Sequence, residues 1–272
     1  MWEKKCMRIV VKVGTSTLTH DSGAANLQSM ERLVRVLADL VGYGHEVVLV
    51  TSGAIAVGTN KLRLQERPKE LRLKQAAAAV GQCELMHFYD KLFGEYNRGV
   101  AQILLTDDDV ADPVRSGHLS GTCRKLLEMG IIPIVNENDS VSSAEIETGE
   151  NKVLGDNDTL SAIVAKLCEA DLLILLSDID GLYDADPHIN KDAKIIPVVT
   201  EITPKLLEMA GGKGTWRGTG GMVTKLSAAK ISMESGFDMV IANGSRPEDI
   251  YDIVAGKEIG TRFVGAVGGN KA

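Results

Sequence analysis

Aromatic residues are scarce in this sequence and make up 4% of its 272 positions. A hydrophobic share of 44% must therefore come mainly from valine, isoleucine, leucine and alanine. Such a composition is typical of parallel sheets that are buried under helices. The length fits one large domain or two lobes that share a sheet.

Cysteines and long apolar runs are also few, and each shortage excludes a class of protein. Cys6, Cys83, Cys123 and Cys168 form no C-x-x-C pair and no group with histidines, so neither a zinc site nor a disulfide framework is expected. No apolar run approaches the roughly 18 residues that span a bilayer, and the start of the chain has no signal-peptide pattern. We therefore expect a cytoplasmic protein without a membrane partner.

Positive charge is in deficit. The formal net charge is -7 and there is no long lysine or arginine run, which argues against a nucleic acid partner. An acidic protein that binds an anionic ligand has to concentrate positive charge in a cleft. Single lysines at the ends of strands are therefore the candidates for such a role.

Short apolar segments alternate with segments of helical length. The expected strands are Arg8–Val13, Glu46–Val50, Val100–Leu105, Ile131–Val135, Asp171–Leu176 and Asp238–Ala242. The expected helices are 27–41, capped by Asn26, then Leu71–Tyr96, Arg115–Met129, Asp156–Cys168, Met222–Ser235, and a short last helix with a capping box at Ser245 and Glu248. The alternation predicts an α/β fold with a mostly parallel sheet.

Small and polar residues follow these strands at their carboxyl ends, where open α/β sheets bind ligands. The residues at four of the strand ends are Lys12, Val13, Gly14 and Thr15; Thr51, Ser52 and Gly53; Asn136, Glu137, Asn138 and Asp139; and Ser177 and Asp178. This pattern predicts an active site along one edge of the sheet.

Lys12 interrupts an otherwise apolar strand. One interpretation is a lysine whose stem lies along an edge strand while its ammonium group reaches water. The other is a cation that faces a phosphate beside Gly14, where the missing side chain lets the backbone approach an anion. Both interpretations stay open at this point.

The segment 211–225 reads GGKGTWRGTGGMVTK and leads into a helix. A glycine-rich loop before a helix suits phosphate binding through backbone N–H groups. Neither standard nucleotide fingerprint matches it, so a plain surface loop is the alternative. Lys225 would supply a second cation on the phosphate side.

Asp156, Asn157 and Asp158 open a predicted helix. Capping explains one of the two acids. The group as a whole also suits binding of a substrate amine and placement of the two lysines. By contrast, Asp107–Asp109 are interpreted as a solvated helix start.

Several segments, in this order, resemble the amino acid kinase family. They are VVKVGTSTLT (10–19), VTSGAIAVG (50–58), IPIVNENDSV (132–141), GDNDTLSA (155–162), LLSDIDGLYDADP (175–187) and GTGGMVTKLSAA (218–229). The resemblance implies a three-layer α/β/α sandwich with an amino-acid-binding lobe at about 1–170 and an ATP-binding lobe at about 171–265. It further implies transfer of the ATP γ-phosphoryl group to the side-chain carboxylate of L-glutamate, the first step of proline biosynthesis.

The resemblance also assigns roles to individual residues. Lys12 and Lys225 would neutralise the phosphoryl group, and Asp158 would orient them. The residues that would hold glutamate are Ser52, Asp139, Asn157 and Asp156. The residues that would line the ATP site are Lys12, Gly14, Thr15, Ser177, Asp178, Thr219, Gly220, Gly221, Met222, Val223, Thr224 and Lys225. Mg²⁺ would be carried by the ATP phosphates, with no metal ligand from the chain.

Two features depart from the family pattern. The loop at 147–154 is longer than in the family, which leaves the glutamate contacts open. The chain also stops at residue 272, so a C-terminal PUA-type domain of the RNA-modification kind is not expected. The family further implies a homo-oligomer, a dimer or tetramer, and proline as a feedback inhibitor.

Two alternatives stay open. The first is that the chain is another kinase of the family, one that acts on aspartate, N-acetylglutamate, carbamate or a nucleoside monophosphate. The fold alone does not choose among these substrates. A non-catalytic amino acid sensor would keep the pocket without turnover. Lys12, Asp158 and Lys225 argue against the sensor, because a sensor does not need cations for phosphoryl transfer.

Overall fold

A computed structural model of the chain describes residues 6–141, 156–185, 187, 190–204, 206–207 and 221–266. In this part of the chain eight strands form one sheet in the order β3-β4-β2-β1-β5-β7-β8-β6. The strands are β1 Arg8–Val13, β2 Glu46–Val50, β3 Val100–Leu105, β4 Ile132–Glu137, β5 Leu172–Ser177, β6 Val198–Val199, β7 Asp238–Asn243 and β8 Thr261–Phe263. All pairings are parallel except that of β7 with β8, which confirms the predicted α/β class.

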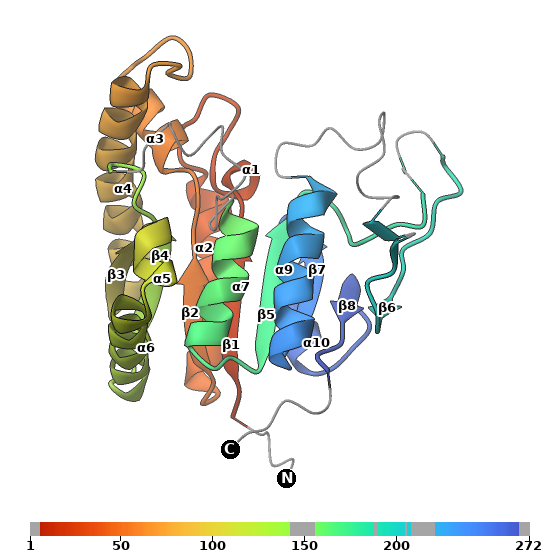
Figure 1. Cartoon of the computed structure of the whole chain (residues 1–272). Helices are drawn as coiled ribbons and strands as arrows, with labels where there is room; N and C mark the ends of the chain where they lie inside the picture. Colours follow the sequence, from red (N-terminus) through yellow and green to blue (C-terminus); the bar gives the residue numbers. More distant parts are fainter. Residues whose placement is uncertain are drawn as a thin grey trace.

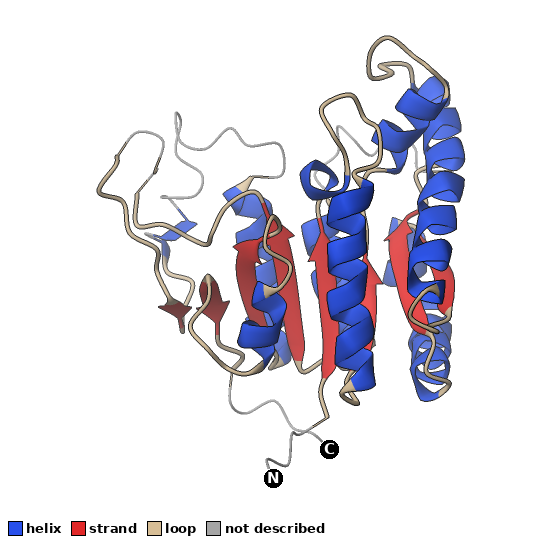
Figure 2. Ribbon diagram, turned by 180° about the vertical axis from the view of Figure 1, so that it is seen from behind, coloured by secondary structure: helices blue, strands red, loops and turns tan. Residues whose placement is uncertain are grey.

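Helices cover both faces of the sheet and give a three-layer sandwich (Figures 1 and 2). The helices are α1 Thr15–Leu18, α2 Leu27–Gly42, α3 Ala54–Lys61, α4 Leu71–Gly94, α5 Asp107–Ala111, α6 Pro113–Glu128, α7 Asn157–Leu167, α9 Met222–Ser235 and α10 Asp249–Val254. Residues of α6, α7 and α9 pack in one core, and residues of α2, α3, α4 and α10 pack in the other. No helix in the described part of the chain has both the length and the apolarity to cross a membrane.

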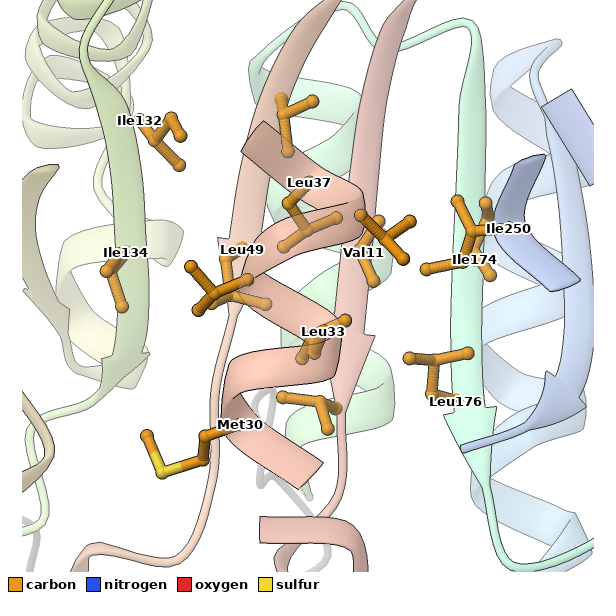
Figure 3. Close-up of a cluster of buried hydrophobic side chains, with 14 of the residues drawn as sticks. Val11, Met30, Leu33, Leu37, Leu49, Ile132, Ile134, Ile174, Leu176 and Ile250 are labelled. Carbon is orange, nitrogen blue, oxygen red and sulfur yellow. The ribbon is translucent and has the colours of Figure 1, made fainter. Parts of the chain in front are cut away.

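The central strand β1 divides its side chains between the two cores. Ile9 and Val11 belong to the core beneath α2, where Figure 3 shows Val11 near Leu33 and Leu37. Val10 belongs to the opposite core, with α7 and α9. Because side chains alternate along a strand, Lys12 lies on the same face as Val10. The lysine therefore points toward α7 and α9 from a central strand, which excludes the edge-strand interpretation.

The predicted cap at Asn26 and the predicted helix start at Asp107–Asp109 are confirmed, whereas the predicted start of the last helix at Ser245 is wrong. Asn26 caps α2 by accepting a hydrogen bond from the Ser29 backbone at 3.1 Å, and Thr106 forms a capping box at the start of α5. The last helix starts at Asp249 instead of Ser245. Glu248 does not close a capping box, because its carboxylate pairs with the Arg32 guanidinium at 2.9 and 2.6 Å. A two-pronged ion pair of this kind is stronger than a neutral cap.

Helices α3 and α4 cross in close contact at two glycines. A Cβ atom on Gly81 would lie 1.8 Å from the Ala54 carbonyl oxygen, and one on Gly58 would lie 1.8 Å from that of Ala77. We expect Gly81→Ala to lower the free energy of unfolding by about 3 kcal/mol, because the two helices must move apart. Urea denaturation measures the change.

The control for this prediction is Gly94→Ala in the same helix. A Cβ atom on Gly94 would meet nothing within 4 Å, so this substitution should leave the stability unchanged or raise it slightly. Equal stabilities of the two variants would contradict the close crossing.

Candidate active site

Three buried charged side chains meet at the carboxyl end of the sheet. The Lys12 Nζ atom lies 2.5 Å from Asp158 Oδ1, and the Lys225 Nζ atom lies 3.2 Å from Asp158 Oδ2. The exposed fractions are 9% for Lys12, 6% for Lys225 and 2% for Asp158. The structure thus brings together the three residues predicted to be catalytic, from positions more than 200 residues apart in the chain.

The positions of Lys12, Asp158 and Lys225 in the fold explain why their side chains meet. Lys12 stands near the end of β1, Asp158 in the first turn of α7 and Lys225 in the first turn of α9. Helices α7 and α9 pack side by side over the middle of the sheet (Figure 1). In a parallel sheet the connecting helices begin at the carboxyl ends of the strands, so both first turns face the same edge.

The three charges do not cancel. Burial raises the pKa of Asp158, but the Lys12 and Lys225 ammonium groups act in the opposite direction and hold it below its ordinary value. The carboxylate is therefore ionised at neutral pH. Two ammonium groups around one carboxylate leave an excess positive charge, which attracts an anionic ligand.

Thr224 ties the start of α9 to this group. Its hydroxyl lies 3.0 Å from Asp158 Oδ2 and 2.7 Å from the Gly221 carbonyl oxygen. Gly221 is the N-cap residue of α9 and has no capping side chain. Among the described residues no side chain caps the first N–H groups of α9, and Lys225 lies in the same first turn, an arrangement that suits an anion.

Gly14 leaves space next to the Lys12 ammonium group. A Cβ atom at this position would lie 3.8 Å from Lys12 Nζ. The backbone has an ordinary φ of -83°, so conformation does not require glycine here. The missing side chain instead keeps the approach to the ammonium group open. Thr15, the next residue, is exposed.

An amide-centred group of polar residues lies on the α7 side of this edge. Asn157 Nδ2 donates to the Thr51 carbonyl oxygen at 2.9 Å, to Ser52 Oγ at 2.7 Å and to Asn136 Oδ1 at 3.2 Å. Because Ser52 Oγ accepts this bond, its own proton is left to donate elsewhere. The Thr51 hydroxyl is held in turn by the buried Tyr89 hydroxyl at 2.8 Å.

Asp156 caps α7 with only one of its two carboxylate oxygens. Its Oδ1 atom accepts from the backbone N–H groups of Asp158 at 2.9 Å and Thr159 at 3.0 Å. Its Oδ2 atom is buried and has no hydrogen-bond partner among the described residues. A buried carboxylate oxygen without a donor is costly unless a ligand supplies one, and an amine is a group that could do so.

Asp139 lies beside a cavity of about 350 Å³ between α4 and the ends of β3 and β4. Ala54 at the start of α3, Gln82 on α4 and Glu137 at the end of β4 also line this cavity. Asp139 thus shares this cavity with Ala54, which follows Ser52 by two residues.

The predicted ATP-side residues lie at the ends of β5 and α9. Ser177 is buried at the end of β5 and donates to the exposed Asp178 carboxylate at 3.0 Å. Met222 and Val223 open α9, the first buried and the second 53% exposed. Thr219 and Gly220, like the loop at 147–154, lie outside the described residues.

The comparison with known families decides the assignment. The model of the amino acid kinase family matches residues 7–243, which contain both lysines and both helix starts.

This chain belongs to the amino acid kinase family.

Its relatives in this family include kinases named for glutamate. A glutamate 5-kinase of Clostridium perfringens is 57% identical over 265 residues, which cover 97% of the chain and 98% of that protein. One of Caldanaerobacter subterraneus subsp. tengcongensis is 56% identical over 258 residues, which cover 95% of the chain and 68% of that protein. The crystal structure of T. acidophilum isopentenyl phosphate kinase in its product complex superposes with a TM-score of 0.61 at 19% identity, over 94% of the chain and 99% of that structure. This last likeness concerns the fold alone.

Two polar residues near the candidate site, Asp180 and Gln82, were not predicted from sequence patterns. Asp180 accepts from Asn243 at 2.9 Å and from Arg246 at 2.7 Å near Ser177, and these bonds hold the pKa of Asp180 below its ordinary value. Gln82 accepts from Asn136 at 2.9 Å. Gln82 could have been noticed in the sequence as a polar residue in an alanine-rich helix. Its partner Asn136 becomes evident only in the structure, where α4 packs on β4.

Proposed function

We propose that the chain transfers the γ-phosphoryl group of ATP to the side-chain carboxylate of L-glutamate and forms γ-glutamyl phosphate, the first step of proline biosynthesis. The observation that carries the proposal is the buried Lys12–Asp158–Lys225 group beside a cluster that suits an amino acid. The 57% identity to a glutamate 5-kinase over nearly the whole chain supports the choice of substrate.

The chemistry requires little of the protein beyond alignment and charge. A carboxylate is already a competent nucleophile, so no general base is needed, and its oxygen attacks the γ-phosphorus as the bond to ADP breaks. Lys12 and Lys225 face the region in which negative charge spreads over the phosphoryl oxygens. Asp158 holds both ammonium groups in place before the ligands arrive, so that little reorganisation is needed during transfer.

The polar cluster offers matching partners for an amino acid. The Ser52 hydroxyl can donate to a carboxylate, because its oxygen already accepts from Asn157. The Asp156 Oδ2 atom, which has no partner among the described residues, suits the α-ammonium group. Asp139, beside the cavity between α4 and β4, is proposed to complete the glutamate site.

The nucleotide is proposed to bind to the carboxyl ends of β1 and β5 and the start of α9. Gly14 and Thr15 would approach the phosphates next to Lys12, and the segment Thr219–Lys225 would surround them from the other side. Ser177 and Asp178 would lie along the nucleotide. Mg²⁺ would arrive on the ATP phosphates and add to the charge neutralisation. In this proposal residues up to about 170 form the amino-acid lobe and residues from about 171 to 265 the ATP lobe.

The same proposal includes a cytoplasmic location, a homo-oligomer of two or four chains, and proline as a competitor of glutamate. Proline shares the α-carboxylate and the amine with glutamate but lacks the side-chain carboxylate, so it would occupy the polar cluster without accepting a phosphoryl group. An inhibition assay with proline against varied glutamate tests this part by itself.

The substrate is tested by ADP production from Mg²⁺-ATP with a panel of acceptors. The panel contains L-glutamate, L-aspartate, N-acetylglutamate, carbamate, a nucleoside monophosphate and isopentenyl phosphate. We expect turnover with L-glutamate to exceed that with each other acceptor. Turnover with a different acceptor would overturn the substrate and keep the kinase, whereas glutamate binding without ADP production would favour an amino acid sensor.

A further inference from the structure

A buried hydrogen-bond relay connects helix α4 with the amino-acid cluster. Asn136 Nδ2 donates to Gln82 Oε1 at 2.9 Å, and Asn136 Oδ1 accepts from Asn157 Nδ2 at 3.2 Å. Asn157 Nδ2 in turn donates to Ser52 Oγ at 2.7 Å. Gln82 is 7% exposed and Asn136 is 1% exposed, so water does not substitute easily for either partner.

Backbone groups fix the direction of every bond in this relay. The Glu137 backbone N–H donates to Asn136 Oδ1 at 3.0 Å, so the other end of the Asn136 amide, which faces α4, has to be the nitrogen. The Thr51 carbonyl oxygen can only accept, so the Asn157 atom beside it has to be the nitrogen as well. Gln82 must therefore present its oxygen to Asn136.

The fixed direction determines what the cluster offers to a ligand. Three acceptors surround the two protons of Asn157 Nδ2, and all three belong to the protein. Ser52 Oγ already accepts one of these bonds, so its proton points to another partner. The cluster thus offers a hydroxyl donor to a carboxylate, and the relay maintains this polarity.

We propose that Gln82 is a positioning residue for the amino-acid substrate, acting through Asn136 and Asn157 on Ser52; this inference builds on the proposed function. Gln82 lies one residue after Gly81, where α4 packs closely against Ala54 of α3. The helix crossing therefore fixes the position of Gln82 Oε1 relative to the end of β4. The role is to hold Asn136, not to touch the reacting atoms.

Loss of the acceptor has a predictable consequence. Without Gln82 Oε1, the Asn136 amide nitrogen would be a buried donor without a partner, and the side chain would shift or rotate to satisfy it. Either movement removes the acceptor that Asn136 offers to Asn157 and so disturbs Ser52. Binding of the acid should suffer, while the lysines and the nucleotide site stay in place.

The experiment compares Gln82→Met, Gln82→Glu and Gln28→Met. Methionine keeps the length of glutamine without its acceptor, and glutamate keeps an acceptor oxygen in either protonation state. Gln28 is exposed in α2 and does not line the cavity, so Gln28→Met makes the same chemical change outside the relay. KM for the acid, KM for ATP and kcat are measured for each variant with the acceptor that the wild type prefers.

For Gln82→Met we expect KM for the acid to rise about tenfold, the loss typical of a buried hydrogen bond. KM for ATP should not change, and kcat should change much less than KM for the acid. Gln82→Glu should restore most of the affinity, and Gln28→Met should behave like the wild type. A purely structural role would instead lower the amount of active enzyme and leave KM unaltered.

An unchanged KM for the acid in Gln82→Met, or a Gln82→Glu variant as impaired as Gln82→Met, would overturn the relay. The proposed function is tested separately by the acceptor that the wild type prefers. If that acceptor is another acid, the substrate assignment is wrong. The relay is still tested, by the ratio of KM for that acid between Gln82→Met and the wild type. A wild type that neither binds nor turns over any acid would overturn both proposals.

Discussion

Replacement of Lys225 by alanine is expected to lower kcat by about 10²–10³-fold, the usual cost of one preorganised charge at a transition state. The ammonium group lies 3.2 Å from Asp158 in a buried position, so neither water nor a surface cation replaces it readily. Lys12→Ala should cause a loss of the same order. ADP production measures the rate, and circular dichroism checks that the chain remains folded.

Lys230→Ala is the matched control on the same helix. Lys230 forms an exposed pair with Glu234 at 3.9 Å, and exposed pairs of this kind contribute little. Its activity should equal that of the wild type. Activity near the wild-type level in either Lys12→Ala or Lys225→Ala would contradict the assignment of the phosphoryl-binding cations.

Asp158→Asn is expected to lower the free energy of unfolding at pH 7 by about 3 kcal/mol, the lower end of the cost of breaking a buried ion pair. The amide would leave the Lys12 and Lys225 ammonium groups close together and buried without the negative charge of Asp158. Turnover should also fall, because the two cations would no longer be held in place. Urea denaturation at several pH values measures the stability.

The stability difference between the wild type and Asp158→Asn depends on pH because the pKa of Asp158 is lowered in the folded state. The two lysines lower this pKa by more than burial raises it. A carboxyl group with a lowered pKa in the folded state stabilises the protein above its unfolded-state pKa, and the contribution disappears as the pH falls through the folded-state value. The gap between wild type and Asp158→Asn should therefore stay constant from pH 7 down to about 5 and narrow below about pH 4.

Glu234→Gln serves as the control for the stability measurement, since its pair with Lys230 is solvent-exposed. Its stability should lie within about 0.5 kcal/mol of the wild type at every pH. A gap between wild type and Asp158→Asn that is small at pH 7, or that grows toward acid pH, would refute the described electrostatics of the buried group.

Much of the fold follows from local patterns. Strands Arg8–Val13, Glu46–Val50 and Val100–Leu105 and helix Met222–Ser235 have the predicted bounds, because apolar runs and glycine boundaries carry strong signals. Strands β6 and β8 were not predicted, since two or three residues carry no periodicity.

The candidate site was predictable to the extent that its residues follow strands. A parallel sheet brings the ends of its strands to one edge, which is why Lys12, Asp158 and Lys225 meet as expected. Gln82 lies in the middle of a helix, and Asn136 is one of several polar residues at the end of β4. Their contact depends on how α4 packs against the sheet, and a pattern along the chain contains no information about that distance.

The most direct test of the account is to trap the product of Mg²⁺-ATP and L-glutamate with hydroxylamine. An acyl phosphate on the side chain reacts to a γ-hydroxamate, and we predict that this compound forms in step with ADP. Its rate of formation should fall by about 10²–10³-fold with Lys225→Ala and stay at the wild-type level with Lys230→Ala. ADP production without any hydroxamate, or a hydroxamate on the α-carboxyl group, would contradict phosphoryl transfer to the side-chain carboxylate.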